Sequence, residues 1–179
     1  MAHIDFINQP LIADATPPWF LEELRAFANR PDTKEAEARR TAAMQRFQAA
    51  QANAQKLWNA GVLVVAGTDA PYPGDFQGEG IHHELQLLVE AGLTPLQAIT
   101  SATRNASQLM NAAADWGTLE PGKLANVLVI NGRPDQNIQE THNVETVIKE
   151  GLVLDRQQLR FNATKDPGFR TSSSVSANQ

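Results

Sequence analysis

The sequence predicts an α/β protein with a small β unit near its carboxyl end. Three observations predict this class. The run Val62–Ala66 is apolar at every position, which is typical of a strand buried on both faces of a parallel sheet. Apolar residues at helical spacing precede and follow that run. From Trp116 onward, glycine and proline separate short β-branched runs, a pattern that favours antiparallel strands.

A short strand and a helix are expected before residue 32. Ile4–Ile7 is apolar-rich and ends at a turn-forming run, so we predict a strand parallel and adjacent to Val62–Ala66. Thr16, followed by two prolines, indicates a helix start because proline is preorganised for the first helical turn. Pro31 is expected to end this helix.

A long helix is predicted from Asp32 to about Asn59. Asp32, with Glu35 three residues later, fits a capping box. We expect the apolar stripe of this helix to pack on a sheet, with a partner-binding helix as the alternative. The stripe consists of Met44, Phe47, Ala50, Ala54, Leu57 and Trp58. Gly61 supplies the left-handed residue that ends the helix.

After Val62–Ala66 the sequence predicts a loop rich in glycine and proline, and then two helices. The first helix is expected to stop at Gly92 and to bury Ile81, Leu85, Leu88 and Val89. The second starts at Thr94-Pro95, where Gln97 occupies the capping-box position, and runs towards Leu109-Met110.

The β unit is expected to contain three strands: Val127–Ile130, Val144–Ile148 and Leu152–Leu154. After about Phe161 the sequence loses its apolar residues, so that tail is predicted to be disordered.

Composition excludes several classes of protein. The chain has 15 Lys and Arg against 20 Asp and Glu, a net charge of −5, which argues against nucleic-acid binding. Without cysteine there is neither a disulfide scaffold nor a thiolate metal site. The longest apolar runs are too short to cross a membrane, and no signal peptide is visible in the first fifteen residues. We therefore expect a cytoplasmic protein that binds neither nucleic acid nor membranes.

Asp69 is the first candidate for chemistry. A carboxylate at the carboxyl end of a buried parallel strand lies where α/β barrels build their active sites. Gly67 and Thr68 allow the sharp turn that this position requires. The alternative is that Asp69 only caps a turn by accepting bonds from backbone N–H groups two residues further on.

His82 and His83 follow the glycine-rich loop, near the same end of the predicted strand. Neighbouring residues on a helix point about 100° apart, so the pair does not fit one metal ion, and surface positions at a helix start are the alternative. Glu79 and Glu84 are candidates of the same kind, with surface positions at the helix start as the alternative. His3 and His142 have no companion ligands in sequence and receive no role, so the residues alone predict no complete metal site.

Three stretches of the chain together resemble the carboxyl-terminal part of a metal-dependent amidohydrolase, in particular the imidazolonepropionase-like branch. They read AGVLVVAGTDAPYPGDFQGEGIHHELQLLVEAGLTPLQAITSATRNASQLM, WGTLEPGKLANVLVINGRP and VIKEGLVLD. The resemblance depends on three specific elements: Gly67-Thr68-Asp69 at the end of the predicted strand, the H-x-E-L-like helix at His82–Leu85, and the spacing of Gly117, Leu119, Gly122 and Ala125. The resemblance covers Leu57–Asp155 strongly and the preceding helices weakly.

The resemblance implies a (β/α)8 barrel beside a small β-sandwich. It implies hydrolysis of non-peptide carbon–nitrogen bonds by water activated on a divalent metal, usually zinc. Asp69 matches the family's aspartate at the end of the eighth strand, which binds the metal or its hydroxide and passes a proton to the leaving amine. His82 matches a histidine common at the start of the following helix, for which a substrate-side role is implied. The implied domains are a partial barrel over 1–113, a sandwich segment over 114–161 and a disordered tail over 162–179.

Two departures from the family pattern matter. Asn126 stands where the family usually has an acidic residue of structural importance. The family's first-strand H-x-H, its bridging lysine or glutamate and its two later histidines have no counterpart here, so by position the chain starts near the seventh strand.

The chain is therefore expected to be a fragment that lacks most metal ligands and is inactive by itself. Its expected partners are a small amide substrate and either a complementary chain or further copies of itself. The alternative function is a catalytically inactive subunit whose barrel another chain completes.

Overall fold

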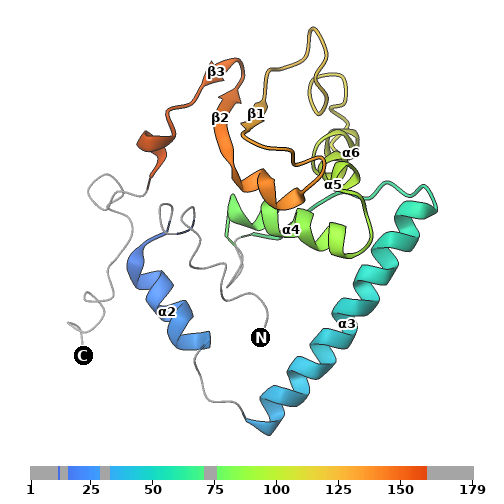
Figure 1. Ribbon diagram of the computed structural model, residues 1–179, viewed down its shortest axis with the longest axis vertical. Helices are drawn as coiled ribbons and strands as arrows, with labels where there is room; N and C mark the ends of the chain where they lie inside the picture. The colour runs from blue at the N-terminus through green and yellow to red at the C-terminus, as the bar shows by residue number, and fades with distance from the viewer. Residues whose placement is uncertain (1–11, 13–15, 29–32, 71–75, 161–179) are drawn as a thin grey trace.

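A computed structural model describes residues 12, 16–28, 33–70 and 76–160 of the chain (Figure 1). Its helices are α2 (Pro18–Ala28), α3 (Lys34–Asn59), α4 (Glu79–Glu90), α5 (Pro95–Ala102) and α6 (Arg104–Leu109), with short 3-10 helices η2 (Ile138–His142) and η3 (Arg156–Leu159). Its strands are β1 (Val127–Ile130), β2 (Val144–Lys149) and β3 (Leu152–Val153). No helix in these described ranges is long and apolar enough to cross a membrane.

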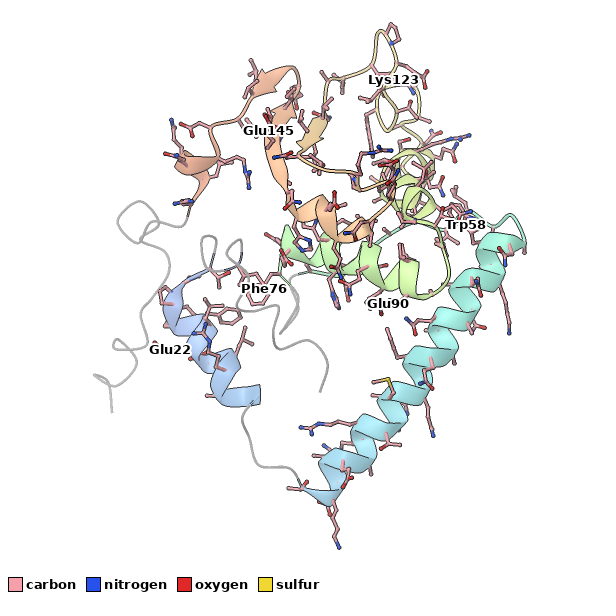
Figure 2. All side chains as sticks on the ribbon, viewed as in Figure 1. Glu22, Trp58, Phe76, Glu90, Lys123 and Glu145 are labelled. Carbon is pink, nitrogen blue, oxygen red and sulfur yellow. The ribbon has the colours of Figure 1, made fainter. Side chains whose placement is uncertain are left out.

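Helix α2 confirms the helix predicted after the two prolines. Leu21 on its inner face packs with Ile12 and Phe76 in a small apolar cluster, which Phe20 and Leu24 flank. The rings of Phe20 and Phe76 meet edge to face, with centroids 6.2 Å apart. Figure 2 shows Phe76 beside α2. This cluster joins α2 to the residues that lead into α4.

Helix α3 has the predicted length but a different cap and a different environment. Its cap is Thr33, whose hydroxyl accepts a hydrogen bond from the Ala36 amide at 3.1 Å, so the predicted cap at Asp32 is one residue early. None of its residues is buried; Met44 is 47% and Leu57 48% exposed. The prediction that its stripe packs on a sheet is therefore wrong. Within the described chain, α3 contacts the core formed by α4, α5 and η2 only at its carboxyl-terminal end, where Trp58 packs against it (Figures 1 and 2).

The prediction of a buried strand at Val62–Ala66 is wrong as well. Gly61 ends α3 with φ +76°, as expected, but the following run belongs to no sheet, and Val62 and Leu63 are 48% and 45% exposed. The physical reason is pairing, because a strand is stable only beside another strand. The predicted neighbour, Ile4–Ile7, lies outside the described residues, and so does the tail after Phe161.

Helices α4 and α5 form the core of the described chain. Leu85, Leu88, Leu93 and Ala98 are buried together with Ile138 from η2, and Val64 and Ala66 pack against them. The predicted capping box at Thr94 and Gln97 is confirmed: the Gln97 amide donates to the Thr94 hydroxyl, and the Gln97 side chain accepts from the Thr94 amide. The expected second helix breaks at Thr103, so it continues as the separate helix α6.

The three predicted strands are confirmed as one antiparallel sheet in the order β1-β2-β3. Val127 faces Ile148 across β1 and β2, and Ile148 faces Val153 across β2 and β3. The connection from β1 to β2 contains η2, which packs against α4 and so fastens the sheet to the helices (Figure 1). The described part of the chain thus combines helices and strands.

One glycine fixes the route from the helices to the sheet. Gly117 has φ +101°, and a Cβ atom on it would collide with the side chain of Ser107, which is fully buried on α6. The chain passes so close to α6 here that no larger residue fits. Gly117 belongs to the glycine spacing on which the family resemblance rests.

Candidate functional site

Asp69 follows the run Val62–Ala66, in which Val62 and Leu63 are exposed and the other three residues are partly buried. Its backbone is left-handed, with φ 57°, and the residue is exposed. The hydroxyl of Thr68 accepts the Ala70 amide at 3.2 Å, so Thr68 is the residue that caps this turn. Residue 71 is a proline without an N–H group, so Asp69 cannot cap the turn two residues on. Aspartate is one of the few non-glycine residues that adopt positive φ readily, so this turn suits the residue type found there.

Two polar residues that sequence reasoning missed hold the segment before Asp69. The side-chain amide of Asn105, on α6, donates to the Val64 carbonyl at 2.8 Å. The Ala66 amide donates to the Ser101 carbonyl at the end of α5, at 3.3 Å. Asn105 and Ser101 are both buried. No signal in the sequence marks either contact, because Ser101 accepts through its backbone carbonyl and Asn105 resembles any other polar helix residue.

His82 is buried, so the alternative of a surface position is wrong for it. The side chain is 8% exposed, and its Nδ1 lies 3.0 Å from the Thr141 hydroxyl oxygen on η2. Its ring stacks on that of His142, with centroids 4.5 Å apart and planes inclined by 29°. Burial lowers the pKa of His82, and the nearby His142 lowers it further, while Glu79 acts in the opposite direction. His83, the neighbour on α4, is partly buried.

His142, which sequence reasoning left without a role, pairs with Glu79. Its Nε2 lies 2.9 Å from Glu79 Oε1, and Glu79 is 3% exposed at the first turn of α4. The hydrogen bond to Glu79 raises the pKa of His142, against the lowering effect of partial burial. The second oxygen, Glu79 Oε2, is buried and has no hydrogen-bond partner among the described residues. No local pattern links positions 63 residues apart, so this pair was invisible in the sequence.

The described residues contain two separate polar sites. Glu79, His82, Thr141 and His142 come together at the junction of α4 and η2. No hydrogen bond or ion pair among the described residues joins Asp69 to this group. Within the described ranges, no three His, Asp or Glu side chains are arranged to hold a metal ion.

Comparison with known proteins defines the class. Residues 31–154 match the sequence profile of the Amidohydrolase family, and the chain belongs to this family. Within it the chain is imidazolonepropionase-like, as the sequence motifs predicted. It is 36% identical over 107 residues to an imidazolonepropionase of Geobacillus kaustophilus, an alignment that covers 58% of this chain and 25% of the relative. The chain spans about a quarter of the length of the curated relatives it matches.

Solved structures agree with the family. A Xaa-Pro dipeptidase with bound methionine in its active site superposes with a TM-score of 0.52 at 34% identity, covering 59% of this chain and 25% of that one. A molinate hydrolase superposes with a TM-score of 0.55 at 29% identity, covering 60% and 26% of the two chains. The described fold therefore corresponds to part of an amidohydrolase.

Proposed function

We propose that this chain is the carboxyl-terminal part of a hydrolase that cleaves carbon–nitrogen bonds of small, non-peptide amides. The observation that carries the proposal is Asp69, an exposed carboxylate at φ 57° that follows the run Val62–Ala66, in a chain of the Amidohydrolase family. In this proposal residues 1–113 are the last part of a (β/α)8 barrel, 114–161 belong to a β-sandwich, and 162–179 form a disordered tail.

Asp69 acts as the proton carrier in this proposal. As a water molecule attacks the carbonyl carbon, the carboxylate accepts one of its protons. The same proton then passes to the amide nitrogen, the carbon–nitrogen bond breaks, and the amine leaves in neutral form. An exposed carboxylate at the end of a short, held segment suits this task, because it can reach both the water and the leaving nitrogen.

The described residues do not supply enough ligands for a catalytic metal ion. A catalytic zinc site takes three protein ligands, and no group of three His, Asp or Glu side chains that could hold a metal ion exists in the described ranges. The divalent metal that the family resemblance implies, with zinc the usual ion, therefore needs ligands from other residues. We propose that Asp69 is the ligand that this part of the chain adds, and that the isolated chain is inactive.

The substrate in this proposal is a small cyclic or linear amide. One relative is named an imidazolonepropionase and one solved structure a Xaa-Pro dipeptidase, so imidazolones are the compounds to assay first. Dipeptides with a prolyl end are assayed beside them to test whether the activity is restricted to non-peptide amides. A substrate contact by His82 stays a prediction. A rise in KM without a fall in kcat in His82→Asn would support that contact.

A second candidate function is a non-catalytic subunit whose barrel another chain completes. The observation that favours it is the half-exposed apolar run Val62–Ala66, which no strand in the described residues covers. A complementary chain or a second copy of this chain could supply the missing strand. A reading frame beside the gene that encodes H-x-H and the other ligands favours the hydrolase.

The deciding experiment compares Asp69→Asn with Glu150→Gln. The full chain is prepared with the complementary amidohydrolase part and zinc, and given imidazolones and Xaa-Pro dipeptides. Asparagine tolerates positive φ, so Asp69→Asn removes the carboxylate without disturbing the turn. We expect a rate loss of about 10²–10⁴-fold. Glu150, also exposed and at φ 53°, is the matched control, and its substitution leaves the rate unchanged.

Full activity in Asp69→Asn would overturn the role of Asp69. Assembly with the complementary part but no hydrolysis of any amide by the unsubstituted complex would favour the non-catalytic subunit.

A further inference from the structure

The junction between α4 and the β unit is built from ionisable groups. Glu79 and His82 lie one turn apart on α4, and His142 ends η2, the connection between β1 and β2. The two rings stack at 4.5 Å, and Glu79 bonds to His142 at 2.9 Å. Two parts of the chain about 60 residues apart in sequence are therefore joined through side chains whose charge changes near neutral pH.

The hydrogen bonds of His142 require a proton at both ring nitrogens or on Glu79. Its Nδ1 lies 2.9 Å from the Gln139 carbonyl oxygen, and its Nε2 lies 2.9 Å from Glu79 Oε1. Both partners are acceptors, and a neutral imidazole carries only one N–H. A neutral ring can therefore donate to only one of the two acceptors, and both bonds together require a second proton. Loss of that proton leaves a ring lone pair facing either the Gln139 carbonyl oxygen or the Glu79 carboxylate oxygen, and removes the positive charge beside Glu79.

The neighbouring ring is held in the neutral form. The Thr141 hydroxyl donates to the Ile138 carbonyl at 2.8 Å, so its oxygen accepts from Nδ1–H of His82. The hydrogen-bond network thus assigns the neutral Nδ1–H tautomer to His82. A proton at Nε2 would place a second positive ring against the first, in a contact between a buried ring and a partly buried one. Like charges so close together repel each other, and burial further disfavours the charged form of His82.

Glu79 is buried at this junction and depends on His142 as its partner. Its carboxylate is 3% exposed, and Oε2 has no partner among the described residues, so His142 is its principal source of compensation. An ionised carboxylate buried without a partner is costly. Separation of η2 from α4 would therefore be opposed by the proton that the pair shares.

No other described charge on the packed elements acts on the two rings as Glu79 does. Helix α4 packs against α5, α3 and η2, and η2 packs against β1. Helix α5 and strand β1 have no ionisable side chain. The remaining ionisable groups on α4, on η2 and in the last turn of α3 are His83, Glu84, Glu90, Glu140 and Lys56. Among charged groups, Glu79 raises the pKa of both rings, and His142 lowers the pKa of His82.

We propose that Glu79, His82 and His142 form a pH-sensitive latch that fastens the β unit to α4. The latch is closed while one proton joins His142 to Glu79 and His82 stays neutral. It weakens on the alkaline side when that proton leaves, and on the acid side when His82 takes up a proton. Thr141 and Ile138 keep η2 in place in part, so the β unit loosens and does not separate.

The two histidines act on stability in opposite directions. The folded pKa of His142 is raised above 6.5, so its contribution is complete below pH 6.5 and is lost as pH rises through the folded value. The folded pKa of His82 is lowered below 6.5, so stability falls as pH falls from 6.5 through that folded value. The junction is therefore tightest near pH 6.5.

Nuclear magnetic resonance titration of the imidazole protons in the full chain tests this directly. We expect the His142 midpoint above pH 6.5 and the His82 midpoint below it. In Glu79→Gln the His142 midpoint should fall to 6.5 or lower, because the group that holds the proton is gone. Glu90→Gln, which removes a carboxylate from the other end of the same helix, should leave both midpoints unchanged.

Amide hydrogen exchange measures whether η2 loosens when the pH changes. After correction for the intrinsic effect of pH, protection of the η2 amides should decrease about tenfold as pH rises through the His142 midpoint, because one charge-assisted bond is lost. In His142→Gln this alkaline step should be absent. A wild-type His142 midpoint at or below 6.5, or η2 protection that does not change across that midpoint, would overturn the proposal. The wild-type titration needs no variant, so it stands even if a substituted chain fails to fold.

Discussion

Residues 79–154 and residues 34–66 differ in how far the described chain covers their apolar side chains. In the first region Ala98 is fully buried, and Ile138 returns from the β unit to pack on α4. In the second, α3 has no buried residue and Val62–Ala66 pairs with no strand in the described ranges. Caps and apolar spacing of the same kind predicted both regions. The difference teaches that local sequence specifies an element, whereas its burial depends on a partner element.

The two regions should differ most in how much stability they lose when one apolar side chain is truncated. Leu88→Ala opens a cavity in the core and should reduce the free energy of unfolding by about 2–5 kcal/mol. Met44→Ala, on the uncovered face of α3, should change it by less than about 0.5 kcal/mol. Urea unfolding of the two variants measures both. Equal losses would mean that α3 is packed as firmly as α4.

A substitution at the close contact between Gly117 and Ser107, inside the first region, should reduce stability nearly as much. Gly117→Ala places a methyl group against Ser107 and forces a positive φ on an L-residue, so we expect a loss of about 2–4 kcal/mol. Gly122→Ala has the same backbone requirement with open space around it, so it should lose only about 1–2 kcal/mol. The difference between their urea midpoints isolates the contact with Ser107. Identical midpoints would contradict that contact.

The bond that joins the two regions should have an intermediate effect. Asn105→Ala leaves the Val64 carbonyl without its donor, at a cost of about 1–3 kcal/mol. Gln108→Ala, at an exposed position of the same helix, should cost less than about 0.5 kcal/mol. Proteolysis between residues 60 and 70 should be faster in Asn105→Ala alone. Unchanged cleavage would show that Asn105 does not hold this segment.

The smallest effect should be a gain in stability. Asp69→Gly and Glu150→Gly relieve positive φ angles of 57° and 53°. The left-handed backbone costs an L-residue about 1–2 kcal/mol, and the greater freedom of glycine in the unfolded chain offsets about 0.4–1 kcal/mol of that, so each variant should gain at most about 1.5 kcal/mol. Thermal unfolding measures the gain. If both variants gain stability but only Asp69→Gly abolishes hydrolysis in the assembled enzyme, the Asp69 side chain is needed for activity and not for folding. Loss of stability in Asp69→Gly would mean that its side chain supports the fold.

Much of the fold could be predicted because its signals are local. The two prolines before α2, the Thr94 capping box and the β-branched strands each depend on residues within one element. The cap at Thr33 was misplaced because Asp32 and Thr33 both have side chains that can cap, and only tertiary geometry chooses between them. The error at Val62–Ala66 has another cause, since an apolar run shows what a segment buries when paired but not whether a neighbour is there.

The sites divide in the same way. Asp69 could be proposed from the sequence because it follows an apolar run and matches a family motif, both of which are continuous in sequence; its role stays a prediction. Glu79 and His142 meet only after α4, the β1 strand and η2 have folded together, so no spacing rule connects them. Asn105 was missed because a buried side-chain amide that holds a neighbouring backbone looks, in sequence, like any polar helix residue.

Amide hydrogen exchange along the full chain at neutral pH tests the central comparison most directly. Our account predicts slow exchange through α4, α5 and the β1–β2 ladder. It predicts fast exchange at Val62–Val65, where the described structure gives only the Val62 amide a backbone acceptor, the Leu57 carbonyl. Addition of the complementary amidohydrolase part should then slow exchange in this segment. Exchange at Val62–Val65 in the isolated chain as slow as in α4 would contradict the account.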